Sequence, residues 1–217
     1  MPAHSQAFTQ SRHADDGRYL HALAGEVWAK CVRCHLPGLV TAQWDGWHWH
    51  ATFDCVGCDL KLDSERGDWV GEVVLSGRRP CGYCGHQWLR PRIRQVGWPR
   101  EVITTVNVEC AACHRSSAVD LEQQPAADIA DCRDPHFGMP LWLVDSGRHG
   151  ALWAYNAAHL QVLKSYVCAT LRERGPASGN ASLLSRLPAW IKAAKNRAAI
   201  TKRLERLERQ LAEASRV

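Results

Sequence analysis

Alternation of apolar and polar side chains predicts β-strands through the first half of the chain. The clearest case spans residues 47–53, whose side chains divide between two faces: Trp47, Trp49, Ala51 and Phe53 on one, His48, His50 and Thr52 on the other. Asp45-Gly46 lies directly before it, a dipeptide typical of hairpin turns because glycine tolerates positive φ. This predicts a hairpin whose first strand is 38–44.

A second pair of strands is predicted farther along. Residues 69–75 are typical of a connecting strand, and Gln87–Arg94 and Val102–Glu109 follow it. We expect the last two to pair as a hairpin.

The second half of the chain begins with one more predicted hairpin and then changes to helical spacing. In the hairpin, two apolar segments flank a polar turn: Leu141–Val144 and Ala151–Tyr155. Asn156 is then a favourable N-cap for a helix reaching about Arg174. Its apolar stripe is Leu160, Leu163, Val167 and Leu171.

A continuous final helix is predicted from Pro188 to about Ala214. One side is apolar and the other basic. The apolar residues are Ile200, Leu204, Leu207 and Leu211, and the basic ones are Lys192, Lys195, Lys202, Arg203, Arg206 and Arg209.

Eight of the ten cysteines fall into four Cys-x-x-Cys pairs, which adds metal chemistry to this pattern. The pairs are Cys31/Cys34, Cys55/Cys58, Cys81/Cys84 and Cys110/Cys113. Eight thiols in this spacing can close two tetrahedral Cys₄ sites, and zinc is the metal that such sites most often hold. We therefore expect two structural Zn²⁺ ions.

Two pairings of these cysteines fit the spacing. Sequential pairing leaves twenty residues between Cys34 and Cys55 and twenty-five between Cys84 and Cys110. A nested pairing would join the two middle pairs and leave the outer pairs to share the other metal. The strand-like sequence inside each sequential hairpin favours the sequential arrangement.

Other uses of paired cysteines fit less well. Disulfides need an oxidising compartment, and the N-terminus has no apolar signal-peptide core, so we expect a cytoplasmic protein with no membrane-spanning segment. Thioredoxin-like chemistry usually needs one such pair beside a βαβ unit, and iron–sulfur clusters use other spacings. Zinc is favoured over all three.

The expected sites are structural rather than catalytic, because a complete Cys₄ set leaves no open position for water. His35, His86 and His114 lie beside the cysteine pairs and are interpreted as outer or solvent-facing groups. Cys168 is interpreted as a buried apolar residue, and Cys132 with His136 makes only a weak metal site. No paired carboxylates or nucleophile–base pattern indicates an enzyme.

The net charge says less about partners than its distribution does. The formal charge is +5, but two zinc ions each bound by four thiolates would lower it to about +1. Residues 159–217 carry twelve Lys/Arg against four Asp/Glu, and residues 76–100 carry six Arg and no acid. These two basic regions are candidates for phosphate or acidic-protein contacts.

Six basic residues are the candidate contacts: Arg90, Arg92, Arg94, Lys195, Lys202 and Arg206. The three arginines alternate with other residues and are expected to share a strand face. Arg78, Arg79 and Arg100 flank them. The tryptophans at 47–53 either stack on bases or, by the favoured interpretation, pack against the rest of the protein.

The predicted fold class is α+β: two tandem Cys₄ zinc-ribbon hairpin modules, then a β-hairpin and a helical region with a long amphipathic helix. The expected boundaries are 1–27 (an irregular lead-in with a short helix or extended segment at 18–24), 28–69 (first ribbon), 70–119 (second ribbon), 120–140 (linker) and 141–217 (hairpin plus helices).

Residues 69–207 resemble a bacterial zinc-ribbon family of poorly defined function. The segments that carry the resemblance are 134–143, 152–160 and 185–197. Similar proteins are labelled as transcription factor IIB-type zinc ribbons or as replication restart helicases. The helicase label reflects only the paired cysteines, since this chain has no Gly-x-x-x-x-Gly-Lys-Ser/Thr loop and is too short for a motor. The resemblance implies a ribbon, hairpin and helix architecture and no activity.

The leading hypothesis is a non-enzymatic zinc protein that binds nucleic acid, or a complex that handles nucleic acid, as an adaptor or regulator. The alternative is a protein-interaction module, such as a subunit of a defence system or an inhibitor of a cognate effector, with zinc purely structural. An enzyme built from dispersed histidines is the third hypothesis.

Overall fold

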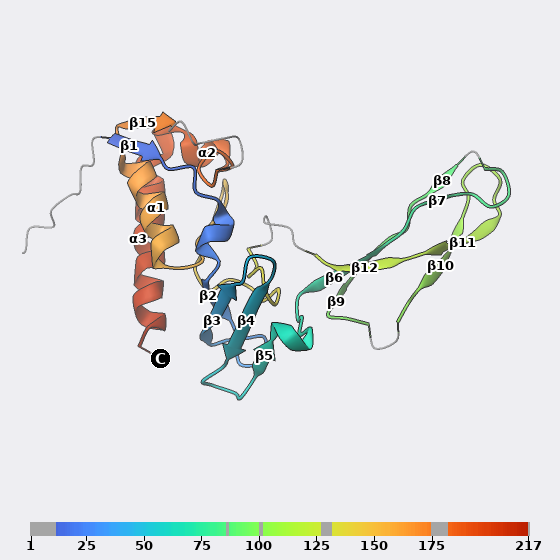
Figure 1. The fold of residues 1–217 in the computed structure, drawn as a ribbon. Helices are drawn as coiled ribbons and strands as arrows, with labels where there is room; N and C mark the ends of the chain where they lie inside the picture. The colour runs from blue at the N-terminus through green and yellow to red at the C-terminus, as the bar shows by residue number, and fades with distance from the viewer. Residues whose placement is uncertain (1–11, 86, 100–101, 127–131, 175–181, 217) are drawn as a thin grey trace, which may run out of the picture.

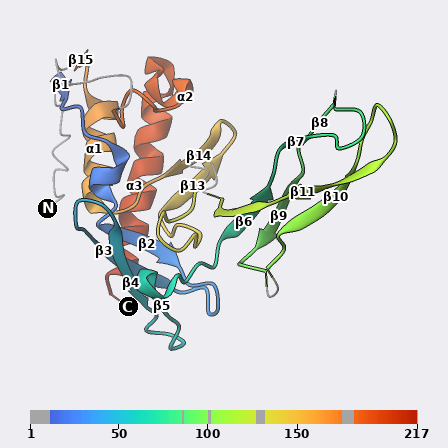
Figure 2. The same cartoon turned by 45° about the vertical axis from the view of Figure 1, so that its right-hand side comes forward.

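The chain forms a mixed α/β body from which a long β arm projects (Figure 1). The computed structural model describes residues 12–85, 87–99, 102–126, 132–174 and 182–216. The arm leaves the body on the side away from the helices α1 and α3, as a second view also shows (Figure 2). The paired cysteines of the first half therefore lie in two different places, one set in the body and the other in the arm.

A four-stranded antiparallel sheet of order β2-β3-β4-β5 is the N-terminal part of the body. Its strands are β2 (Glu26–Lys30), β3 (Pro37–Trp44), β4 (Trp49–Asp54) and β5 (Lys61–Asp63), and the turn η2 (Ser64–Arg66) follows. The predicted hairpin is present: Trp44 pairs with Trp49, and Gly46 in the turn has φ +107°. The Asp45-Gly46 signal thus fixed the register of β3 against β4.

One face of β4 packs into the core, but not all four apolar residues predicted for it do so. Ala51 and Phe53 are buried and Trp49 is half-buried, whereas Trp47 is 83% exposed. Trp47 lies in the turn before β4 begins, where the strand alternation no longer applies. The prediction that it shares the buried face was wrong.

The sheet is extended by the C-terminal half of the chain rather than standing alone. The Trp28 N–H donates to Tyr155 O, and Ala29 forms a β-bridge with Leu141. Phe137 and Met139 are fully buried in the same core as Phe53. The range 120–140, expected to be a linker, therefore contains a core segment, because its turn residues direct two large apolar side chains under the sheet.

The arm begins as a three-stranded antiparallel sheet of order β12-β6-β9 and ends in two short hairpins. Its strands are β6 (Glu72–Ser76), β7 (Arg79–Pro80), β8 (Trp88–Leu89), β9 (Arg92–Val96), β10 (Thr105–Glu109), β11 (Ser116–Asp120) and β12 (Glu122–Pro125). β7 pairs with β8, and β10 pairs with β11.

The hairpin expected between 87–94 and 102–109 is not formed. The sequence 87–94 is divided at Arg90 and Pro91, and β9 then pairs with β6 through contacts such as Leu75 opposite Ile93. β6 is buried along Val73–Leu75 and satisfies its hydrogen bonds on both edges. This apolar central strand takes β9 as its partner, which the local alternation alone did not reveal.

Two glycines hold the base of the arm against the body. A Cβ at Gly71 would lie 2.7 Å from the Cα of Gly138, so only residues without a side chain allow this approach. Gly138 also has φ +72°. The Val70 and Gly71 N–H groups both donate to Phe137 O. The arm is therefore anchored to the buried core segment of the body.

The C-terminal region packs helices on a small hairpin. Its elements are β13 (Val144–Gly147), β14 (Gly150–Trp153), α1 (Ala157–Cys168), β15 (Leu171–Arg174), α2 (Ala189–Lys192), η4 (Ala194–Asn196) and α3 (Arg197–Ala214). Nearer the N-terminus, η1 (Leu20–Leu23) and β1 (Arg12–Asp15) complete the body, and β1 pairs in parallel with β15. The N-terminal lead-in, expected to be irregular, therefore contains a strand whose partner lies more than 150 residues later in the chain.

The first helix is shorter than predicted. Asn156 caps it as expected, since its Oδ1 accepts the His159 N–H at 2.9 Å. It ends at Cys168, and Leu171 is 47% exposed in β15 rather than part of the apolar stripe. The Arg172 guanidinium donates to the carbonyls of Tyr166 and Val167, which satisfies the helix end. A side chain beyond the helix thus terminates it.

The final helix is broken rather than continuous. Pro188 is the N-cap of α2, and Ala193 has extended backbone before η4 and α3. The Asn196 amide donates to Trp190 O at 2.9 Å and satisfies a carbonyl that the break leaves free. α3 has 18 residues, about 27 Å, whereas a continuous helix over 188–214 would be about 40 Å long.

The apolar side of α3 forms a second core with α1 and β14. Ile200, Leu204 and Leu207 are buried there, and Leu211 packs against it partly buried. None of the helices in the described part of the chain is long and apolar enough to cross a lipid bilayer. The stripe predicted for this helix is an internal packing surface.

Candidate metal centres and the exposed surface of the arm

The first cysteine cluster lies within the body core. It joins the end of β2 to the end of β4, and it consists of Cys31, Cys34, Cys55 and Cys58. The sulfur atoms of Cys31 and Cys58 are 3.5 Å apart, and those of Cys34 and Cys55 are 3.4 Å apart. Cys31 and Cys55 are buried beside Val27 and Phe53. The sequential pairing is the one present in this half.

The second cluster lies at the end of the arm and consists of Cys81, Cys84, Cys110 and Cys113. Its sulfur–sulfur distances are 3.7 Å for Cys81 to Cys113 and 3.8 Å for Cys84 to Cys110. Among the described residues, Leu89 and Val119 join the buried cysteines in its core. With so small an apolar core, the end of the arm depends on its cluster for its structure.

Each Cys-x-x-Cys segment closes in the same backbone turn. The residue after the second cysteine has positive φ at all four: His35 (63°), Asp59 (55°), Gly85 (70°) and His114 (55°). Its N–H donates to the carbonyl of the first cysteine at His35, Gly85 and His114. The turn aims both thiols toward one point and explains why three side chains occupy the left-handed region. His86 lies outside the described residues.

Two of these turns also favour the thiolate form of their leading cysteine, whereas burial raises the pKa of Cys55. The backbone N–H groups of Cys84 and Tyr83 donate to the Cys81 thiol and lower its pKa to about 6. For Cys31, burial opposes ionisation, but the N–H groups of Cys34 and Arg33 outweigh it and lower the pKa to about 7. Both clusters thus present a ready anionic sulfur to a cation.

The donor sets fit a tetrahedral metal ion. With metal–sulfur bonds of about 2.3 Å, a tetrahedral site has sulfur–sulfur edges of about 3.8 Å, close to the observed separations. Four thiol ligands fill such a site and leave no position for substrate or water. The clusters therefore indicate structural metal binding, and among the described residues no other group of three or more His, Cys, Asp and Glu gathers in this way.

The remaining two cysteines take no part in these clusters. Cys168 Sγ lies 4.0 Å from the Thr201 hydroxyl, between α1 and α3. His136, considered with Cys132 as a weak metal pair, instead binds Ala24 O through Nε2 at 2.8 Å. That ring is therefore engaged with the backbone.

The predicted contact arginines of the arm are all exposed but do not lie on a single strand. Arg92 and Arg94 alternate on one face of β9, while Arg90 lies in the break before it. Arg94 also approaches Glu72, at 3.5 Å, which offsets part of its charge. Arg90 and Arg92 are the arginines of this set with no acidic partner among the described residues.

Two exposed aromatic residues near the second cluster were not selected from the sequence. Trp88 is 46% exposed with the Arg78 guanidinium 4.3 Å from its ring centre, and Tyr83 is 60% exposed with Arg115 at 5.1 Å. A guanidinium over a ring is a cation–π contact. The β7–β8 pairing brings Arg78 to Trp88, and the meeting of the two Cys-x-x-Cys turns in the second cluster brings Arg115 to Tyr83, so residue spacing carried no signal.

The basic residues of the C-terminal helices are not arranged as one basic face. Lys195 and Lys202 are exposed, but Arg203 is buried and Arg206 pairs with Asp145 at 2.7 Å. Arg203 also donates to Asp145. Because α3 and the arm lie on opposite sides of the body (Figure 1), the two predicted contact groups do not form a single surface.

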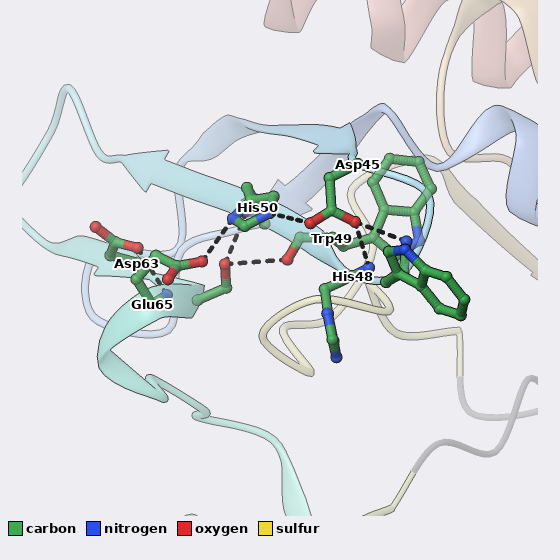
Figure 3. Close-up of polar contacts among 9 residues, drawn as sticks. Asp45, His48, Trp49, His50, Asp63 and Glu65 are labelled. Atoms are coloured by element: carbon green, nitrogen blue, oxygen red, sulfur yellow. Dashed lines mark hydrogen bonds and ion pairs between the residues drawn. The ribbon is translucent and has the colours of Figure 1, made fainter.

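The β3–β4 turn has its own charged network (Figure 3). His50 bridges two carboxylates, with Nε2 2.9 Å from Asp45 and Nδ1 2.6 Å from Glu65. His50 donates a hydrogen bond to each carboxylate. These two bonds raise its pKa, the bond to Asp45 having the larger effect. The Asp45 carboxylate accepts hydrogen bonds from the His48 N–H and from the His50 ring. These bonds lower its pKa, the bond from His48 having the larger effect.

We expect replacement of Asp45 by Asn to lower the pKa of His50. Asn keeps an oxygen for the Trp47 and His48 N–H groups but removes the charge beside the imidazolium. Because the folded pKa is raised, the pair stabilises the turn fully below about pH 6.5 and less as pH rises through the folded value.

NMR titration of the histidine Cε1–H signals between pH 6 and 9 measures this, in a range where thiolate ligands retain metal. The Glu65→Gln variant is the matched comparison and should also lower the pKa. A His50 that titrates at the ordinary imidazole value in the unmodified protein would contradict the network.

Comparisons with protein-family models, with curated proteins and with solved structures found no match to this chain.

Proposed function

We propose that both cysteine clusters hold Zn²⁺ as structural ions in zinc-ribbon modules, and that the protein is a non-enzymatic binder of nucleic acid or of a complex that carries it. The closed Cys₄ donor sets support the first statement. They supply no vacant coordination position, so the zinc ions shape the surface rather than react.

The observation that carries the nucleic-acid proposal is the pair of exposed aromatic rings at the end of the arm, each beside a guanidinium. Unpaired bases stack on such rings, and each stacked base contributes about 1–3 kcal/mol. Arg90 and Arg92 add positive charge for the phosphates, and both are exposed. The combination favours a single strand, whose bases are free to stack, over a duplex.

The arm is the proposed binding surface, with Arg94 a weaker contributor because of Glu72. Lys195 and Lys202 are proposed to add only long-range attraction, since they lie on the body. Arg206 contributes least, because Asp145 holds its charge.

Fluorescence anisotropy with labelled single-stranded DNA and RNA tests the proposal on the zinc-loaded protein. We expect binding at about 50 mM salt that weakens steeply by about 200 mM. The Tyr83→Ala/Trp88→Ala variant should lose at least about tenfold in affinity, as expected for two stacked bases. Lys195→Ala/Lys202→Ala is the matched control and should change it much less.

Absence of binding to any single strand or duplex at low salt would overturn the nucleic-acid proposal and leave the zinc assignment untouched. Metal analysis tests zinc separately, with two ions per folded chain expected.

One feature favours the second candidate, a protein-interaction module. Val96 and Val102 are 79% and 77% exposed near the base of the arm, with Trp98 at 42%. Apolar side chains so exposed are typical of a protein contact. If Val96→Asp/Val102→Asp abolishes recovery of one stoichiometric protein partner while Tyr83→Ala/Trp88→Ala does not, this candidate is preferred.

A further inference from the structure

A large cavity lies in the body, away from both cysteine clusters. Its volume is about 1030 Å³, at the upper end of the range for sites that take drug-sized molecules. Its walls come from segments far apart in sequence: η1, β14, the first turns of α1, and residues 183–191. No helix or strand forms it alone, so it exists only in the folded body.

The walls are largely apolar and rich in aromatic rings. Trp49, Trp153 and Trp190 contribute indole rings, and Leu163 and Ile191 contribute aliphatic side chains. Among the described residues that line it, none is an aspartate or a glutamate. Arg186 lines the cavity and is exposed, so it lies where the cavity meets solvent. Such a cavity favours an apolar molecule, and Arg186 is the one lysine or arginine among its described lining residues.

Two buried polar groups line these walls. His159 is 2% exposed, and its Nδ1 accepts the Tyr155 N–H at 3.2 Å. Since Nδ1 is an acceptor, the neutral ring carries its proton on Nε2. Burial lowers the pKa of His159 to about 4, so this neutral donor form persists at physiological pH. Tyr155 is 5% exposed, and burial raises the pKa of its hydroxyl above the ordinary value, which keeps the O–H protonated.

Neither group has a hydrogen-bond partner among the residues that the structure describes. In that part of the chain, the side-chain atoms that have neither a hydrogen-bond partner nor accessible surface are Arg197 Nε and Gln210 Oε1. The Tyr155 hydroxyl and His159 Nε2 are not among them, so these two unpartnered atoms keep some accessible surface. Both residues line the cavity, so the cavity is the space onto which they open. Two donors that face a largely apolar cavity are available to an acceptor on a bound molecule.

We propose that this cavity is a binding site for an apolar, aromatic-ring small molecule that carries a carboxylate. The rings of the walls pack against its apolar part. The carboxylate accepts hydrogen bonds from the Tyr155 hydroxyl and the His159 Nε2–H, and Arg186 supplies the opposite charge. No covalent step is involved, and the site is independent of the arm and of the proposed nucleic-acid contact.

The test uses the zinc-loaded full chain and two matched probes, pyrene-1-carboxylate and pyrene-1-methanol. Either probe bound beside Trp153 and Trp190 quenches tryptophan emission by energy transfer, which gives affinity and stoichiometry. We expect one site per chain and carboxylate binding about tenfold or more tighter than alcohol binding, because hydrogen bonds to a charged group contribute about 1.5–3 kcal/mol.

Two variants test whether the site recognises the carboxylate of the probe, and a third is a control for the fold. Tyr155→Phe removes one unpartnered hydroxyl and keeps the ring, so folding should be unaffected. It and Arg186→Gln should each weaken carboxylate binding about fivefold or more and leave alcohol binding unchanged. Arg209→Gln, an exposed change on α3 outside the cavity, is the control.

Equal affinity of the two probes, or carboxylate binding that both variants leave unchanged, would overturn the assignment of the head group. No quenching by either probe up to its solubility limit would overturn the site itself.

Discussion

Replacing Cys55 and Cys58 by serine is expected to unfold the body, whereas replacing Cys110 and Cys113 should disorder only the end of the arm. Cys31 and Cys55 are buried in the same core as Phe53 and Met139, so losing their metal removes the support of the main core. Structural zinc contributes about 10–16 kcal/mol in small domains, as much as a typical domain's whole stability.

The second cluster has a core of its own, with only Leu89 and Val119 beside its buried cysteines. No residue of this core belongs to the core of the body. Loss of the second cluster should therefore affect only the end of the arm, and α1 and α3 should keep their packing.

Near-UV circular dichroism, zinc content and limited proteolysis measure the difference. The Cys110→Ser/Cys113→Ser variant should keep one zinc and a protease-resistant body, while Cys55→Ser/Cys58→Ser should lose tertiary signal. Cys168→Ser is the control and should keep two zinc ions, since it lies in neither cluster. Equal loss of structure in both double variants would refute the separation of the two cores.

Replacing Asp145 by alanine is expected to destabilise the body by about 3–5 kcal/mol, because it leaves a buried cation without its counter-charge. The Arg203 side chain is only 10% exposed and donates to the Asp145 carboxylate at 2.5 Å. Arg203 also donates to the carbonyls of Asp145 and Gly150 and lies over the Trp190 ring. Dipoles and a ring do not replace a full negative charge.

Urea unfolding of the zinc-loaded protein measures this loss. Arg206→Ala is the matched comparison: it removes the exposed partner of the same carboxylate, and Arg203 still neutralises Asp145, so a much smaller effect is expected. An Asp145→Leu/Arg203→Met double variant should recover much of the stability, since it removes both buried charges. If Arg206→Ala costs as much as Asp145→Ala, the pair is not the stabilising element.

Local signals in the sequence predicted local features well. Asp45-Gly46 predicted a hairpin that is present, and Asn156 predicted a helix start that its side chain caps. The strand-like sequence between the cysteine pairs favoured the sequential grouping that the structure contains, although the hairpin expected for the second group is not formed. The hairpin turn and the helix cap depend on residues within a few positions of one another, and so does the turn that each Cys-x-x-Cys segment makes.

Predictions failed where a distant residue completes the structure. β9 pairs with β6 rather than with β10. The first helix ends early where Arg172, which also donates to Lys192 O twenty residues away, donates to its last carbonyls. Arg203 was predicted to lie on the basic side of the final helix, but Asp145, more than fifty residues earlier, holds it in the body. Helical periodicity and strand alternation report which side of an element is apolar, not which partner it meets.

By itself, then, the sequence determined the two donor sets, the turns that present them and the apolar stripes of the helices. The tertiary structure alone decided that one cluster lies in a core and the other on an arm. It also decided that the basic residues are dispersed and that a cavity with unpartnered donors lies between η1, β14 and α1. The reason is physical: turn geometry and ligand spacing are properties of short segments, whereas burial, pairing and cavities depend on contacts between segments that the chain brings together only on folding.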